Sequence, residues 1–169
     1  MSPTTVLGVQ FTFSLVLFSL VAKWYITPAL KPLPTPAALV PLFLVHALRY
    51  LPSSAFAPGQ VGAAAPMRAL QIIAYGDLAS AVLAIVAAAF LFYRWQGAIA
   101  VAWIANIVTS ADWIYGGYVA ASNQLVTYPL GGNWYIINFY VPVIGVIHVM
   151  IFVRLFQART PSFTGVAQS

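Results

Sequence analysis

Five apolar segments follow one another along this chain, separated by places where charged, proline, glycine or interfacial aromatic residues gather. A hydrocarbon layer of roughly 30 Å requires about 20 helical residues per crossing. The 169 residues therefore leave room for four or five crossings and little else. With 62% hydrophobic and 5% charged residues, the chain has more apolar surface than a water-soluble fold of this size can bury. We predict an all-α, polytopic transmembrane helix bundle with spans at about residues 5–27, 36–51, 68–93, 97–121 and 133–156.

The whole chain, residues 1–169, is expected to form a single integral membrane domain, with a flexible polar tail at 158–169. The first segment lacks the cationic region of a secretory signal, so we expect it to be a span. The second segment stops before Pro52 and is short for a full crossing, and residues 52–67 are predicted to be an irregular outer loop. A four-span protein in which the second segment is re-entrant is the alternative.

The basic residues predict the orientation of the bundle. The formal net charge is +5, but the seven cations are spread along the chain and form no cluster, so no nucleic acid partner is expected. Cytoplasmic loops of membrane proteins are enriched in Lys and Arg. We therefore predict the N-terminus outside and the C-terminus inside, in a multi-pass protein of the bacterial cytoplasmic membrane. In this model one side carries five cations and the other carries Arg49 and Arg68; the five are Lys23, Lys31, Arg94, Arg154 and Arg159.

Both acidic residues of the chain lie inside predicted spans. An ionised carboxylate at bilayer depth costs at least a few kcal/mol, so each requires a partner, water or a proton. At 1.5 Å per residue, Asp77 lies about 13 Å and Asp112 about 15 Å from the outer ends of their helices, at one common level. His46 and Arg49 are expected roughly 8 Å and 3 Å below the outer end of the second helix. We predict that Asp77 faces the bundle interior, opposite Arg49 or His46.

Several polar side chains thus converge on the outer half of the bundle. They form the predicted ligand-binding site: His46, Arg49, Gln71, Tyr75, Asp77, Asp112 and Asn138. In one interpretation they line a pocket for a small amphiphilic or apolar molecule, such as an isoprenoid-like compound. Arg49 and His46 would orient its polar end, and Asp77 with Asp112 would balance charge or hold a proton. In the other interpretation Arg49 pairs with one aspartate and His46 with the other, without any ligand.

Other small and polar residues in the spans are expected to serve packing. Ser80, Ala84 and Ala88 follow one another at four-residue spacing, which allows close approach of a neighbouring helix. Asn106 and Ser110 also lie four apart and are expected to form interhelical hydrogen bonds, with contact to a ligand as the alternative.

Besides a secondary transporter, which five spans without a detectable repeat fit poorly unless the protein oligomerises, three other classes of function remain open. The small size of the chain fits an accessory or assembly subunit of a larger membrane complex, or a homo-oligomer. A membrane-embedded enzyme could use His46 with Asp77 or Asp112 as acid and base, although no catalytic motif is present and catalytic residues stay unassigned. The third class is a single-haem, cytochrome b-like protein with His46 and His148 as haem ligands.

Estimated depth argues against the haem interpretation. His148 lies roughly 21 Å from the outer end of its helix and His46 roughly 8 Å from its own, whereas two histidines on one iron must share a level. The chain has no cysteine, which excludes thiolate metal sites. We therefore predict no metal and no cofactor.

Overall fold

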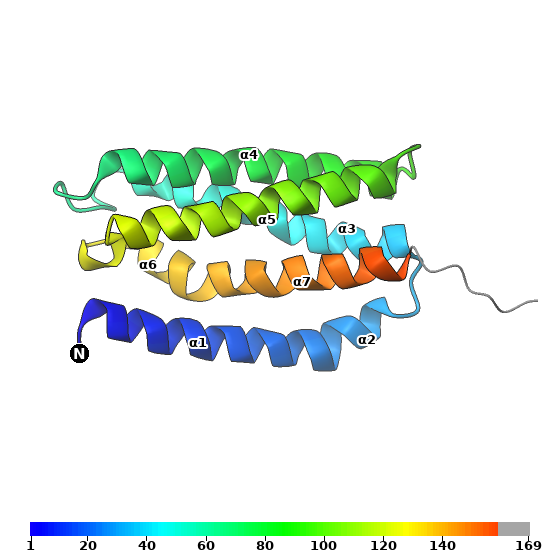
Figure 1. Cartoon of the computed structure of the whole chain (residues 1–169), viewed down its shortest axis with the longest axis horizontal. Helices are drawn as coiled ribbons and strands as arrows, with labels where there is room; N and C mark the ends of the chain where they lie inside the picture. Colours follow the sequence, from blue (N-terminus) through cyan, green and yellow to red (C-terminus); the bar gives the residue numbers. More distant parts are fainter. Residues whose placement is uncertain (159–169) are drawn as a thin grey trace, which may run out of the picture.

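The computed structural model describes residues 1–158, which form a bundle of helical rods lying side by side (Figure 1). No strand occurs within these residues. In the same range five helices are long and apolar enough to cross a membrane: Pro3–Leu30, Thr35–Phe56, Met67–Phe92, Ala98–Ser122 and Asn133–Gln157. The prediction of an all-α, multi-pass membrane protein is therefore confirmed. The predicted flexible tail, apart from its first residue Ala158, lies outside the described residues.

Each rod consists of one or more consecutive helical elements. The α-helices are α1 (Pro3–Val21), α2 (Thr27–Leu30), α3 (Thr35–His46), α4 (Met67–Phe92), α5 (Ala98–Ser122), α6 (Asn133–Tyr135) and α7 (Val141–Gln157). The elements between them are two π-helical segments, η1 (Ala22–Ile26) and η4 (Ile136–Tyr140), and two 3-10 segments, η2 (Ala47–Phe56) and η3 (Leu125–Thr127).

The second rod differs most from the sequence prediction, because it does not stop before Pro52. Proline has no N–H to donate in either type of helix, and in an α-helix its ring also clashes with the carbonyl four positions earlier. The chain instead continues as the tighter 3-10 helix η2, so the rod has 22 residues and residues 52–56 of the predicted irregular loop are helical. A 3-10 helix rises about 2.0 Å per residue, so η2 extends the rod by about 20 Å beyond His46.

The most extensive helix packing in the bundle involves α4, which packs along α5 and against α3 and η2. The predicted small-residue series Ser80, Ala84 and Ala88 is buried, so these helices approach closely, as expected. A continuous apolar core fills the end of the bundle opposite the N-terminus. Its largest members are Leu39, Leu42, Phe43, Leu91, Ile147, Ile151 and Leu155.

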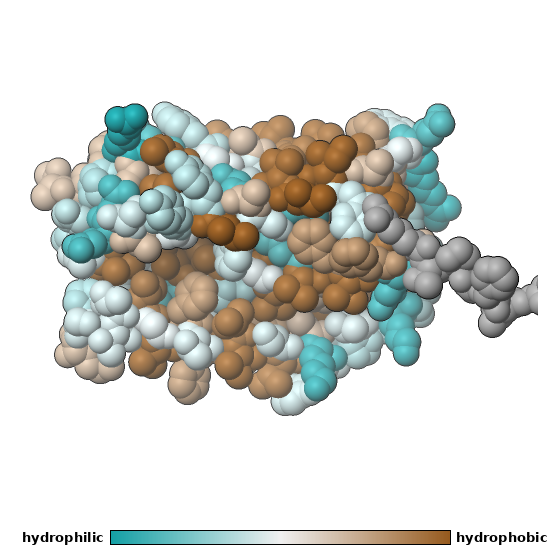
Figure 2. Space-filling view, viewed as in Figure 1, coloured by the Kyte–Doolittle hydropathy of each residue, from teal (hydrophilic) through white to brown (hydrophobic). Residues whose placement is uncertain are grey.

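The surface of the bundle carries an apolar belt. In Figure 2 hydrophobic residues (brown) gather over the middle of the visible face, and most of the hydrophilic residues (teal) lie toward its two ends. Large apolar side chains such as Phe13, Val82, Ile104 and Val149 are exposed on four different rods. A belt of this kind suits contact with lipid, because apolar patches of such extent are rare on soluble monomers.

Candidate functional site

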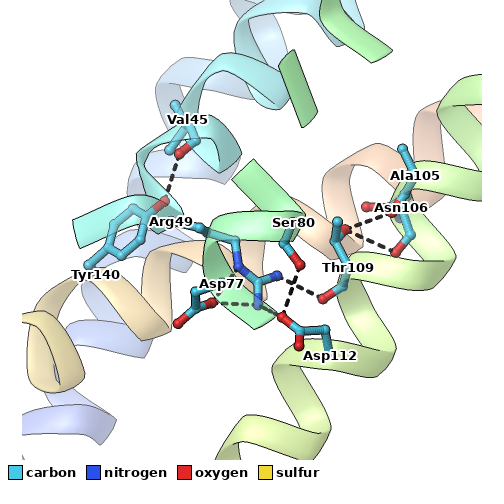
Figure 3. Close-up of polar contacts among 9 residues, drawn as sticks. All are labelled: Val45, Arg49, Asp77, Ser80, Ala105, Asn106, Thr109, Asp112 and Tyr140. Carbon is cyan, nitrogen blue, oxygen red and sulfur yellow. Dashed lines mark hydrogen bonds and ion pairs between the residues drawn. The ribbon is translucent and has the colours of Figure 1, made fainter. Parts of the chain in front are cut away.

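Arg49 joins both acidic residues of the chain, as Figure 3 shows. Its Nε donates to Oδ1 of Asp77 at 2.7 Å, and its Nη2 donates to Oδ2 of Asp112 at 2.6 Å. Its Nη1 donates to the backbone carbonyl of Thr109 at 2.7 Å. The Arg49 side chain is buried, so every acidic side chain of the protein is held by one buried guanidinium. The prediction that Asp77 faces inward, opposite Arg49, is confirmed.

The 3-10 segment η2 brings Arg49 to the level of the aspartates. Arg49 is seven residues before Phe56, the last residue of η2, and at about 2.0 Å per residue it lies about 14 Å from that end of the rod. This distance matches the depths predicted for Asp77 and Asp112. The expected depth of roughly 3 Å for Arg49 was wrong, because that estimate ended the second helix before Pro52.

Two residues of α4 accommodate the Asp112 carboxylate. Ser80 Oγ donates to Asp112 Oδ2 at 2.9 Å. A Cβ added at Gly76 would overlap Asp112 Oδ1, so the carboxylate rests on α4 only because residue 76 is glycine. Gly76 was not predicted from the sequence, and Ser80 was expected only to pack. The sequence did contain a signal for this role: Gly76 and Ser80 are four residues apart, so both lie on one face of the helix, close to Asp77.

A cavity of about 850 Å³ extends from this charged cluster to the N-terminal end of the bundle. Arg49, Asp77 and Asp112 form the charged part of its wall. The remaining wall is mainly apolar and comes from α1, η2, α4, α5, η4 and α7, with residues such as Leu7, Phe11, Ile73, Trp113, Gly116 and Ile144. Cavities of 300–1,000 Å³ with a few converging polar groups are typical of small-molecule sites.

Two of the predicted site residues lie on the opposite side of α4. Gln71 and Tyr75 are exposed, and neither lines the cavity. Tyr75 instead packs against Phe56, with ring centroids 5.9 Å apart. Successive residues of an α-helix turn by about 100°, so Tyr75 points about 200° away from Asp77. The structure therefore does not bring these two side chains to the cluster.

Asn138 is buried in η4 but does not line the cavity either. Its Nδ2 donates to the carbonyl of Trp134 at 2.9 Å, one turn earlier in the same rod. Asn138 therefore makes a hydrogen bond within its own rod and does not contribute to the cavity wall.

His46 lies beside His148, with ring centroids 4.3 Å apart, and not beside an aspartate. Within the described residues no hydrogen bond or ion pair joins His46 to Asp77 or Asp112, so the predicted pairing of His46 with an aspartate was wrong. The predicted difference in level between the two histidines was also wrong. Because η2 places His46 about 20 Å from the end of its rod, it reaches the depth expected for His148.

His148 is anchored to α5. Its Nδ1 is 2.8 Å from Ser110 Oγ and 2.9 Å from Asn106 Oδ1, which confirms the predicted interhelical hydrogen bonding of these two residues. Two imidazoles on opposite sides of one iron have ring centroids about 6 Å apart, because each metal–nitrogen bond is about 2.0 Å long. The rings of His46 and His148 are closer than that, so their arrangement does not fit a bis-histidine haem.

Comparison with protein-family models matches residues 6–156 to a domain of unknown function, DUF8737. No curated protein and no solved structure matches the chain. The matched range includes parts of all five helices that are long and apolar enough to cross a membrane, and the whole Arg49, Asp77 and Asp112 cluster. Since the match covers most of its length, the chain belongs to the DUF8737 family.

Proposed function

We propose that this protein binds a small amphiphilic or apolar molecule in the cavity beside Arg49, Asp77 and Asp112. The observation that supports this function is the cavity itself, about 850 Å³ in volume, with a mainly apolar wall that contains both acidic residues of the chain. Ionisable groups within membrane spans are energetically expensive and commonly mark ligand or ion sites.

The same three residues also tie η2, α4 and α5 together, so a purely structural role is the competing explanation. The exposed fractions of the three side chains favour a ligand-binding role over a purely structural one. The Arg49 side chain is only 3% exposed, whereas those of Asp77 and Asp112 are 16% and 24% exposed. The two carboxylates therefore border open space, which a cluster serving only to join helices does not require.

The proposed location is the bacterial cytoplasmic membrane, with the N-terminus and the cavity on the outer side. The helices α2, α4 and α7 end at the side of the bundle opposite the N-terminus (Figure 1). Lys31 directly follows α2, Arg94 follows α4, and Arg154 lies in the last turn of α7. Lys23 lies in η1, shortly before α2. Arg68 lies at the N-terminal end, while Arg159 is outside the described residues. This distribution of cations supports the orientation, because positive charge is enriched on the cytoplasmic side.

The absence of cysteine from the chain allows a direct test of orientation. Ala57 and Gln96 are both exposed, in the loops that follow η2 and α4. In intact cells or spheroplasts, a membrane-impermeant maleimide is expected to label an Ala57→Cys variant. It should label Gln96→Cys only after the membrane is permeabilised. The opposite pattern would reverse the proposed orientation.

Filling the cavity is expected to remove its ligand. Gly116 lines the cavity, and a Cβ added there meets no atom within 4 Å, so Gly116→Leu places a side chain where the ligand would lie. Native mass spectrometry of the gently extracted protein should show a bound small molecule that this variant loses.

The matched control is Gly8→Leu in α1. A Cβ at Gly8 also meets no atom within 4 Å, but Gly8 does not line the cavity, so this variant should keep the bound molecule. Equal retention by both variants would place the molecule elsewhere. Wild-type protein that carries no small molecule but copurifies with a partner would favour the accessory-subunit alternative.

A further inference from the structure

The charges in the cavity wall do not balance. One guanidinium, that of Arg49, faces the two carboxylates of Asp77 and Asp112, so the fully ionised cluster has a formal charge of −1. Among the described residues, no other Lys or Arg lines the cavity. An uncompensated charge inside a membrane bundle is costly. The cluster therefore attracts a further positive charge.

Arg49 is poorly placed to receive an anionic ligand. Its Nε, Nη1 and Nη2 already donate to Asp77, to the carbonyl of Thr109 and to Asp112. Its side chain is almost fully buried behind these partners. An incoming carboxylate or phosphate would have to displace them while also meeting the negative charge of both aspartates.

Asp77, in contrast, has one carboxylate oxygen that can still accept a hydrogen bond. The hydrogen bonds found in the described residues use only Oδ1 of Asp77. In Figure 3 its second carboxylate oxygen points away from Arg49. The corresponding Oδ1 of Asp112 lies against Gly76 and has less room. Asp77 Oδ2 is thus the acceptor that the cavity offers to a ligand.

We infer that the molecule bound in this cavity is a cationic amphiphile, with an ammonium group that donates to Asp77 and an apolar body along the hydrophobic wall. This inference rests on the proposed function and specifies the class of ligand. The cavity wall also contains the aromatic side chains of Trp113 and Tyr140, and aromatic rings attract cations. Arg49 then acts as the residue that positions the two carboxylates, and the ligand supplies the missing positive charge.

The test uses three probes of equal chain length: octylammonium, octanol and octanoate. Their affinities are measured by isothermal titration calorimetry with detergent-solubilised wild-type protein and with Asp77→Asn. The substitution keeps the size of the side chain and an oxygen that can accept from Arg49, and it removes one negative charge. Each probe partitions equally into the micelles of both samples, so the ratio between the two proteins reports the site alone.

Octylammonium is expected to bind Asp77→Asn at least about tenfold more weakly than wild type, because a buried charge partner is lost. Octanol should change by less than about threefold, and octanoate should not favour the wild-type protein. Asp112→Asn removes the same charge and is expected to weaken octylammonium binding as well. It serves as the second variant if Asp77→Asn does not fold.

The possible failures are distinguishable. If octanol binds the wild-type protein and the affinity for octylammonium is the same in wild type and in both variants, the inference of a cationic ligand is overturned. The proposal that the cavity binds a small molecule then stands. Octanoate that binds wild type more tightly than Asp77→Asn would also overturn the cationic ligand, because it would assign the polar end to Arg49. Binding of none of the three probes to the wild-type protein would overturn both proposals.

Discussion

Arg49→Met is expected to destabilise the protein by about 3–5 kcal/mol, because it leaves two largely buried carboxylates without their cation. Equilibrium unfolding in mixed detergent micelles measures this loss. The control is Arg68→Met, since Arg68 is exposed in the first turn of α4 and has no ion pair among the described residues. It should change stability by less than about 0.5 kcal/mol. An Arg49→Met protein as stable as this control would contradict the ion cluster.

A triple variant separates the effect of charge from that of packing. Arg49→Met combined with Asp77→Asn and Asp112→Asn removes all three charges and nearly conserves volume. Replacing a whole buried ion cluster by neutral groups is often close to neutral, so the triple variant should recover part of the stability lost in Arg49→Met. If it is no more stable than Arg49→Met, then the lost packing of the Arg49 side chain is the cause.

Gly76→Ala is expected to destabilise the protein by about 1–3 kcal/mol, the cost of overpacking a close contact. The added methyl group would overlap Asp112 Oδ1, so α5 would have to move away from α4 or the carboxylate would have to leave Arg49. Unfolding in the same micelles as above measures the effect.

Gly8→Ala is the matched substitution for Gly76→Ala. Gly8 also lies inside a helix, but an added Cβ meets nothing within 4 Å. Alanine is a better helix former than glycine, so Gly8→Ala should be neutral or stabilise by up to about 1 kcal/mol. Equal effects of the two substitutions would mean that the Asp112 carboxylate does not rest on α4.

The two candidate roles of the Arg49 cluster predict different behaviour in ligand binding. A cluster that only joins helices should make Asp77→Asn affect stability without distinguishing octylammonium from octanol. A cluster that also completes a binding site should make the same substitution selective for the cationic probe. The second oxygen of Asp77, which no hydrogen bond among the described residues uses, lies on a side chain that is 16% exposed, and this favours the second outcome.

The sequence by itself was sufficient for the class of the protein and for the number of helices able to cross a membrane. Hydropathy is a sum over neighbouring residues, so five apolar segments can be recognised without knowing how they pack. The common level of Asp77 and Asp112 was also predictable, because both lie in regular α-helices where depth follows from counting at 1.5 Å per residue. The sequence could also have shown that Tyr75 lies outside the site, because two residues along an α-helix turn by about 200° and so place Tyr75 on another face than Asp77.

Only the tertiary structure decided which groups meet the two aspartates. Arg49 and His46 lie where they do because η2 is a 3-10 helix with a larger rise, and apolar composition does not distinguish it from an α-helix or a loop. Gly76 matters only because Asp112 arrives from another rod. The cavity likewise exists only between assembled helices. Contacts of this kind depend on the rotation and distance of neighbouring rods, which the sequence of one segment does not determine.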